Sequence, residues 1–135
     1  MTTNEDKSEV PPKKIRSHRD LIVWQKGIAL AVETSQLARA LPASERFALK
    51  DQMVRAAISI PSNVAEGQGQ MAKGAYVRHL AIARGSLHEL ETLMELARQI
   101  GYFDDTVLEK AKLLADEVGR MLWVLMERLG ARRLN

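Results

Sequence analysis

The sequence contains no cysteine, which excludes disulfide bonds and zinc sites built from thiolates. It also lacks an apolar run of the ~18 residues that a membrane-spanning helix requires. The first ten residues, MTTNEDKSEV, do not follow the charged-then-apolar pattern of a signal peptide. These absences predict a protein of the reducing cytoplasm that does not use a membrane as a partner.

Histidine is scarce, with three residues in 135. His79 and His88 lie nine residues apart in one predicted helix, so their side chains point to different sides of it. A di-iron site in a helical bundle needs Glu-x-x-His on two helices, whereas this chain has one run, His88-Glu89-Leu90-Glu91, in the wrong order. No glycine-rich loop carries the lysine of a phosphate-binding loop, and no serine, histidine and acid are spaced as a catalytic set. We therefore predict no metal, no cofactor and no enzymatic activity.

The chain is mildly basic, with a net charge of +3 and an isoelectric point near 9.4. Residues 1–19 are polar, contain two prolines and show no apolar periodicity, so we predict a disordered basic arm. Residues 131–135 form a short basic tail. We interpret the basic arm as a solvated tail. The alternative is a phosphate-contacting arm, because clustered Lys and Arg release counterions from nucleic acid. The candidate nucleic-acid contacts are Lys13, Lys14, Arg16, Arg19, Arg132 and Arg133.

Apolar residues recur at steps of three and four in four segments, at about residues 21–40, 44–69, 72–100 and 104–129. This period predicts four amphipathic helices. No segment alternates apolar and polar residues over a length that a strand needs. Helices joined by short loops favour an up-down-up-down four-helix bundle over residues 20–130. The predicted fold class is therefore all-α.

Three local expectations follow from single residues. Asp20 is predicted to cap the first helix. Pro61 lies within the second helix, where its ring removes a backbone donor and clashes with the carbonyl of Ala57, so we predict a kink. Ser62 and Asn63 are expected to donate hydrogen bonds to the backbone groups that the proline leaves unpaired. The apolar face of this helix is predicted to include Phe47, Val54, Ala57 and Ile58.

Nine polar residues of the second and third helices stand out within the apolar repeat. We interpret them as caps and as a buried hydrogen-bond network that fixes helix register, since buried charges must be paired. A ligand site and an intersubunit role are the alternatives. The residues are Gln52, Arg55, Ser59, Ser62, Asn63, Glu66, Arg84, Ser86 and Glu89.

The third helix carries a second flank, Ile82, Gly85 and Leu96, that is too apolar for ordinary surface. The first helix likewise has two apolar stripes, more than one packed neighbour needs. Exposed apolar surface of this kind usually marks an interface, and Gly85 would allow a close backbone approach. We therefore predict a homo-oligomer with this flank at the subunit contact, closed as a head-to-tail ring if the subunit count is odd.

Four stretches carry a family resemblance: LIVWQK at residues 21–26, ERF at 45–47, RAAISIPSNVAEG at 55–67 and IARGSLHELET at 82–92. They resemble the four-helix-bundle proteins encoded by intervening sequences of bacterial 23S ribosomal RNA genes. The similarity covers about residues 20–103. A related branch is the basic accessory protein of diversity-generating retroelements, which binds nucleic acid and assists a reverse transcriptase.

The resemblance implies a bundle assembled into a ring-like homo-oligomer, with five subunits expected, whose molecular function is not established. Two positions depart from the family pattern, since Val54 and Gln70 stand where arginine is common. The predicted function is that of a non-enzymatic oligomeric bundle with a weak RNA- or DNA-binding or accessory role. The alternative, which the two lost arginines favour, is a structural or protein-partner-binding bundle without nucleic-acid affinity.

Overall fold

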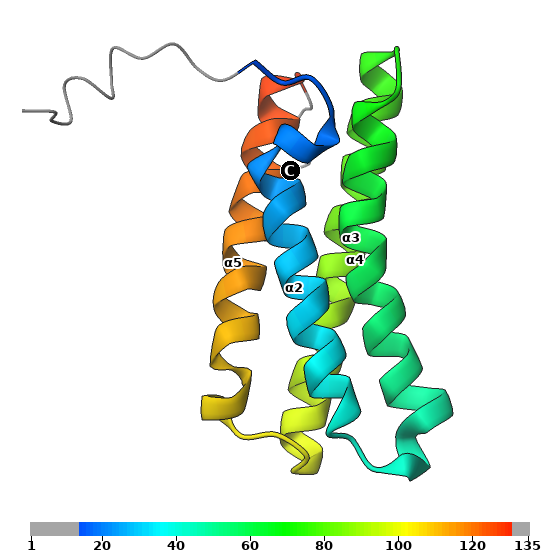
Figure 1. Cartoon of the computed structure of the whole chain (residues 1–135), viewed down its shortest axis with the longest axis vertical. Helices are drawn as coiled ribbons and strands as arrows, with labels where there is room; N and C mark the ends of the chain where they lie inside the picture. The colour runs from blue at the N-terminus through cyan, green and yellow to red at the C-terminus, as the bar shows by residue number, and fades with distance from the viewer. Residues whose placement is uncertain (1–13, 131–135) are drawn as a thin grey trace, which may run out of the picture.

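The computed structural model describes residues 14–130, which contain four α-helices and no strand. The helices are α2 (Ile22–Arg39), α3 (Asp51–Gln68), α4 (Lys73–Ile100) and α5 (Asp105–Arg128). Consecutive helices run in opposite directions, and α5 packs back against α2, so the four close an up-down-up-down bundle (Figure 1). The predicted all-α four-helix bundle is therefore confirmed.

One apolar core runs along the bundle, and every helix contributes to it. Fully burying a side chain such as Leu30, Leu90 or Leu122 stabilises the fold by about 1.5–3 kcal/mol. One apolar stripe of α2 is fully buried. The second lies at the edge of the core, with Trp24 and Ala31 half-buried and Ile28 exposed. Thr34, a polar member of the buried stripe, is fully buried and donates its hydroxyl to the Leu30 carbonyl at 2.8 Å. The buried stripe is Val23, Gly27, Leu30, Thr34 and Leu37.

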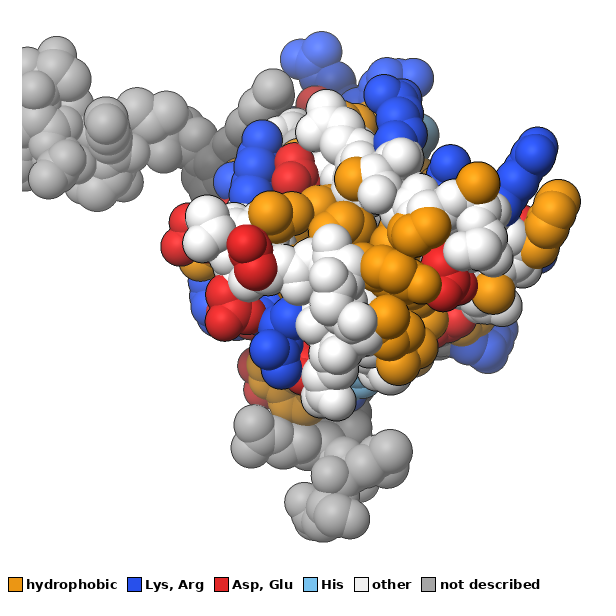
Figure 2. All heavy atoms as spheres, turned by 90° about the horizontal axis from the view of Figure 1, so that it is seen from below, with side chains coloured by type: hydrophobic (Ala, Val, Ile, Leu, Met, Phe, Trp, Pro, Cys, Tyr) orange, Lys and Arg blue, Asp and Glu red, His pale blue; other side chains and the backbone are white. Residues whose placement is uncertain are grey.

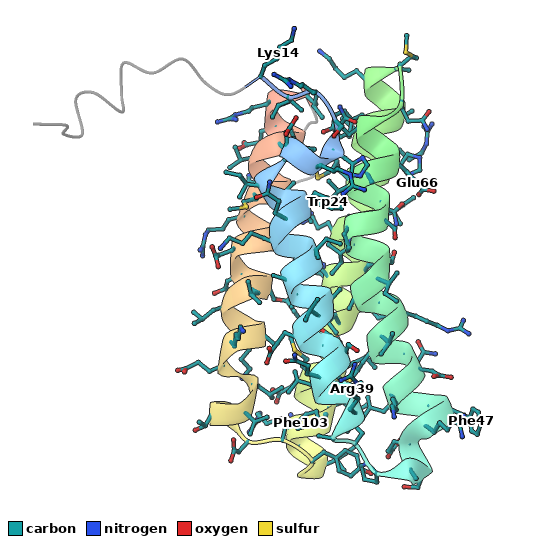
Figure 3. All side chains as sticks on the ribbon, viewed as in Figure 1. Lys14, Trp24, Arg39, Phe47, Glu66 and Phe103 are labelled. Atoms are coloured by element: carbon teal, nitrogen blue, oxygen red, sulfur yellow. The ribbon has the colours of Figure 1, made fainter. Side chains whose placement is uncertain are left out.

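The second helix does not begin with α-helical geometry. A 3₁₀ helix, Ala43–Glu45, leads into a π-helical turn, Arg46–Lys50, and only then does α3 start. A π turn holds more residues than an α turn, so its side chains fall out of phase with the stripe that follows. Phe47 is consequently 83% exposed and points away from the bundle (Figure 3), while Leu49 is buried. The prediction that Phe47 faces the core was wrong, as it was for Ile58, which is 52% exposed.

The helix continues through Pro61 to Gln68 as one element, as predicted, and it bends along its length (Figure 1). Pro61 is buried against Gly27 of α2. A Cβ atom added to Gly27 would lie 3.4 Å from the Cβ of Pro61, within ordinary van der Waals contact, so the two helices pack directly against each other here. The fixed backbone angle of proline is compatible with a helix, and its cost is one lost hydrogen bond to the Ala57 carbonyl.

A 3₁₀ helix at His18–Asp20 precedes α2. The Asp20 carboxylate accepts a hydrogen bond from the Arg16 amide at 2.8 Å and belongs to a capping box with Ser17. Leu21 precedes α2 without a side-chain cap, so the prediction that Asp20 caps this helix was wrong. The described structure thus includes residues 14–19 of the predicted arm. Residues 1–13 and 131–135 lie outside the described range.

The connection between α4 and α5 follows the local sequence rules. Gly101 ends α4 with φ of 102°, a left-handed conformation that glycine adopts without strain. The Asp104 carboxylate caps α5 by accepting from the Val107 amide at 2.9 Å. Tyr102 donates its hydroxyl to Glu45 at 2.6 Å, which ties this loop to the one that precedes α3.

Candidate functional site

A chain of hydrogen bonds crosses the contact between α3 and α4. The hydroxyls of Ser59 and Ser86 lie 2.7 Å apart. The buried Asn63 amide donates to the Ser59 carbonyl at 2.8 Å and to the Ser59 hydroxyl at 3.0 Å. Its oxygen lies 3.2 Å from Nδ1 of His79. We call this set, Ser59, Asn63, His79 and Ser86, the polar seam.

The polar seam fixes the hydrogen position on His79. The Asn63 nitrogen donates to Ser59, so the Asn63 oxygen must accept from His79, and Nδ1 must carry the hydrogen. Glu66 lies 3.8 Å from the same nitrogen and is largely exposed. Both the neutral and the charged ring keep this donor. The contact therefore orients the two helices and does not depend on the charge of the histidine.

Glycine at position 67 allows the close packing beside the seam. A Cβ atom there would lie 2.9 Å from both the Cβ of His79 and the Cδ1 of Tyr76. Real Cβ atoms do not approach so closely, so the missing side chain lets α4 lie directly against α3. Register between the helices is thus set by polar pairing and by steric fit together.

The structure brings together only part of the predicted polar network. Ser59, Asn63, Glu66 and Ser86 meet as described, and His79, which the sequence reasoning missed, joins them. The sequence spacing could have identified His79, because it precedes Ser86 by seven residues and so lies on the same face of α4. The other five predicted members are exposed: Gln52, Arg55, Ser62, Arg84 and Glu89.

The hydrogen bonds that we expected from Ser62 and Asn63 to the backbone groups left unpaired by Pro61 also differ from those in the structure. Asn63 donates to the carbonyl of Ser59, whereas the carbonyl deprived of its donor by Pro61 is that of Ala57. Asn63 is a link between helices that also pairs with its own backbone one turn earlier. Ser62 points outward and lines a surface groove.

The polar seam holds no activated nucleophile. Ser59 neighbours a second hydroxyl and an amide, neither of which is a base that could take its proton. Within residues 14–130, no group of three or more His, Asp or Glu side chains is placed to hold a metal ion. In the same range, no helix is long and apolar enough to cross a membrane.

Basic residues gather at one end of the bundle, which we call the basic end: residues 14–21, 65–78 and 125–130. It contains six Lys and Arg residues and three acids, for a net charge of +3. One of the acids, Asp20, is engaged with backbone amides. Lys14 projects from this end (Figure 3). The basic residues are Lys14, Arg16, Arg19, Lys73, Arg78 and Arg128.

The start of α2 adds an aromatic group to the basic end. The Arg19 guanidinium lies over the Trp24 ring, 5.7 Å from its centroid, and the His18 ring meets the same indole edge-on at 5.0 Å. Gln25 donates to the Arg19 carbonyl at 2.9 Å. Of the predicted nucleic-acid contacts, Arg19 is held by its side chain and Arg16 by its backbone amide, and Lys14 is exposed beside them. Lys13, Arg132 and Arg133 lie outside the described residues.

The opposite end, at residues 37–51 and 95–109, has the opposite charge. It contains four Lys and Arg residues against six acids, for a net charge of −2. Hydrogen bonds from Arg98 and Gln99 lower the pKa of Glu95 to about 2. Viewed from this end, hydrophobic side chains gather between charged ones of both signs (Figure 2). Charge is thus segregated along the bundle axis.

The predicted subunit contacts lie on the surface of the single chain. Ile82 and Leu96 are 49% and 48% exposed, and no atom lies within 4 Å of a Cβ placed on Gly85. A second apolar surface is a groove of about 310 Å³ between α2 and α3. Its lining residues are Trp24, Ile28, Ala31, Ile58, Pro61, Ser62 and Ala65.

Residues 19–124 match the family model of the 23S rRNA-intervening sequence protein. A solved structure with the same fold is that of a protein of unknown function from the S23 ribosomal protein family of Bacteroides thetaiotaomicron. The two chains are 22% identical and superpose with a TM-score of 0.73 over 78% of this chain and 96% of the other. No curated protein matches the sequence. Since the family model spans most of the bundle, the chain belongs to the 23S rRNA-intervening sequence protein family.

Proposed function

We propose that the protein is a non-enzymatic homo-oligomer that binds nucleic acid through its basic end. The observation that carries this proposal is the segregation of charge along the bundle, +3 at one end and −2 at the other. A uniformly mixed surface of the same net charge would attract a polyanion in no particular orientation. A segregated surface steers a phosphate backbone to one end of the molecule.

The layout of the basic end supports contact with phosphates. Its cations come from three separate parts of the chain that the antiparallel bundle brings to one end. The 3₁₀ turn at His18–Asp20 and the bond from the Arg16 amide to Asp20 hold the backbone of the first group, so less backbone entropy is lost when its side chains bind a ligand. The Arg19 guanidinium lies over the indole of Trp24, so a cation–π contact holds this charge at the basic end.

Assembly would multiply the effect of this charge. The exposed flank at Ile82, Gly85 and Leu96 and the α2–α3 groove are different surfaces, as a head-to-tail contact requires. In a cyclic ring every subunit has the same orientation relative to the ring axis. The basic ends would then lie at equivalent positions around the axis, and several weak contacts to one polymer would act together.

The test is a salt titration of binding to labelled single-stranded RNA and to duplex DNA. Counterion release requires log affinity to fall linearly with log salt, by about 0.7 per phosphate contacted on a single strand. We expect the triple variant Lys14→Ala, Arg16→Ala, Arg19→Ala to lower both the affinity and this slope. The matched control, Arg39→Ala, Arg46→Ala, Arg55→Ala, removes the same charge away from the basic end and should change neither.

A structural or protein-partner-binding bundle is the second candidate, favoured by the exposed apolar side chains and by Val54 and Gln70 in place of common arginines. The same titration separates the two candidates. No binding to either polymer at low salt removes the nucleic-acid proposal and leaves the second candidate. Equal losses in the two triple variants would also remove it, because they would show attraction to net charge alone.

A further inference from the structure

A groove runs between α4 and α5, on the face of α4 that turns away from the polar seam. Its volume is about 530 Å³, within the range of small-ligand sites. The groove combines apolar, aromatic and charged side chains. From α4 it is lined by Arg84, Leu87, His88 and Glu91, and from α5 by Ala115, Asp116, Gly119, Arg120, Trp123 and Val124.

The floor of the groove is apolar because two small residues of α5, Ala115 and Gly119, lie there one turn apart. A Cβ atom on Gly119 would lie 3.3 Å from Leu87 Cδ2, so the two helices lie close together at this point. Trp123 lies one turn further along. The guanidinium of Arg84 is positioned over its ring, 5.3 Å from the centroid, in a cation–π contact that joins the two helices.

The charges of the groove are divided between its two halves. Arg84 and Arg120 lie in the half that contains Trp123, and Glu91 and Asp116 lie in the other half. Within residues 14–130, none of these four side chains forms a salt bridge. The groove therefore offers two cations beside an aromatic side chain. Asp116 lies about one helical turn from Arg120, and Glu91 lies about two turns from Arg84.

We propose that this groove binds one nucleotide of a single-stranded nucleic acid. Arg120 and the edge of Arg84 take the phosphate, since guanidinium groups pair with phosphate in a fork of hydrogen bonds. The base stacks on the Arg84–Trp123 pair, as unpaired bases do on guanidinium and aromatic planes. Its exocyclic amino group donates to Glu91 or Asp116, because carboxylates accept from such groups.

This inference rests on the proposed function and adds a ligand class to it. A paired base in a duplex is stacked on its neighbours and cannot enter the groove. Adenine, cytosine and guanine carry an exocyclic amino group, whereas uracil has none and can offer a carboxylate only its ring N3 hydrogen. The groove is thus expected to prefer single strands and amino-bearing bases, a selectivity that the basic end by itself lacks.

The experiment uses the Trp24→Phe protein, in which Trp123 is the sole tryptophan, since the sequence has two. Its fluorescence is measured while AMP, CMP or UMP is added, with correction for nucleotide absorbance. We expect saturable quenching by AMP and CMP and weaker quenching by UMP. Arg120→Ala should weaken AMP binding about tenfold, as the loss of a charge-assisted contact implies. Arg55→Ala, which removes an exposed charge from α3, is the matched control and should have no effect.

A second variant tests the preference for amino-bearing bases. Glu91→Gln with Asp116→Asn replaces the two acceptor-only carboxylates by amides and should remove the difference between AMP and UMP. Absence of saturable quenching, or equal affinities for AMP and UMP in the parent protein, would overturn the groove proposal. A shift of Trp123 emission with protein concentration alone would assign the groove to a second copy of the chain and overturn it as well. Salt-sensitive polymer binding lost in the Lys14, Arg16, Arg19 variant would still leave the proposed function standing.

Discussion

The side-chain oxygen of Asn63 accepts a hydrogen bond from Nδ1 of His79, and this contact spans α3 and α4 at a distance of 3.2 Å. The same amide donates to Ser59 on its own helix, so one buried side chain pairs with both elements. Moving α4 by one residue would break the bonds at His79 and at Ser86 together. The polar seam therefore selects one register among those that the apolar stripes alone would permit.

Replacing Asn63 with leucine tests this role. The change leaves the His79 donor without its partner in a partly buried position, so we expect the free energy of unfolding to fall by about 1–3 kcal/mol. Urea denaturation measures it. Ser62→Ala, on the neighbouring exposed position, is the control and should stay within about 0.5 kcal/mol of the parent protein. An unchanged midpoint for Asn63→Leu would contradict the role of the seam.

A methyl group at position 67 should be poorly tolerated. In Gly67→Ala the new Cβ would lie 2.9 Å from the Cβ of His79, an atom that cannot move without α4, so we expect a loss of about 1–3 kcal/mol. Gly74→Ala in the first turn of α4 meets no atom within 4 Å and should be neutral or slightly stabilising. Thermal unfolding of the two variants gives the comparison. Equal melting temperatures would show that α4 shifts freely at this point.

Self-assembly can be tested on the exposed flank of α4. Light scattering at micromolar concentration should give a mass several times the 15.1 kDa of one chain. Ile82→Glu with Leu96→Glu places charge on two half-exposed apolar positions and should lower that mass. A mass of one chain for the parent protein at every concentration would refute the oligomer.

Gly85→Ala separates folding from assembly. Its added methyl meets nothing within 4 Å in the single chain, and alanine favours a helix interior by about 0.5–1 kcal/mol over glycine. We therefore expect weaker association together with an unchanged or higher stability of the protomer. Association as strong as that of the parent protein would place Gly85 away from the subunit contact.

Stability at low pH should report the pairing of Glu95. The hydrogen bond from Arg98 is the main cause of its lowered pKa of about 2, so the folded state favours the ionised carboxyl. A depressed pKa contributes stability above the unfolded value near 4.5, and that contribution is lost as pH falls toward 2. Glu95→Gln should thus be less stable than the parent protein at pH 7, and the gap should close between about pH 4.5 and 2. A gap that does not change with pH would show that the ion pair contributes nothing.

The polar seam was only partly predictable from the sequence. Serine and asparagine within an apolar repeat mark Ser59, Asn63 and Ser86 as unusual, since polar groups in a core must be paired. The identity of each partner depends on how two helices meet, and His79 looked like an ordinary half-exposed residue until α4 was placed beside α3. Arg84, grouped with the seam by its position in the sequence, lies across α4 against Trp123.

What the sequence by itself determined is local: the period of the apolar residues, the glycine that ends α4 and the aspartate that begins α5 define four helices and their order. These features depend on a few neighbouring residues, whose backbone preferences act within one or two turns.

Tertiary structure decided which of the two stripes of α2 is buried, because both satisfy the same period. It decided the exposure of Phe47, since the π-helical turn changes the phase of the side chains before α3. It also brought cations from three distant segments to one end, which follows from the antiparallel packing of helices and from no single stretch of the chain.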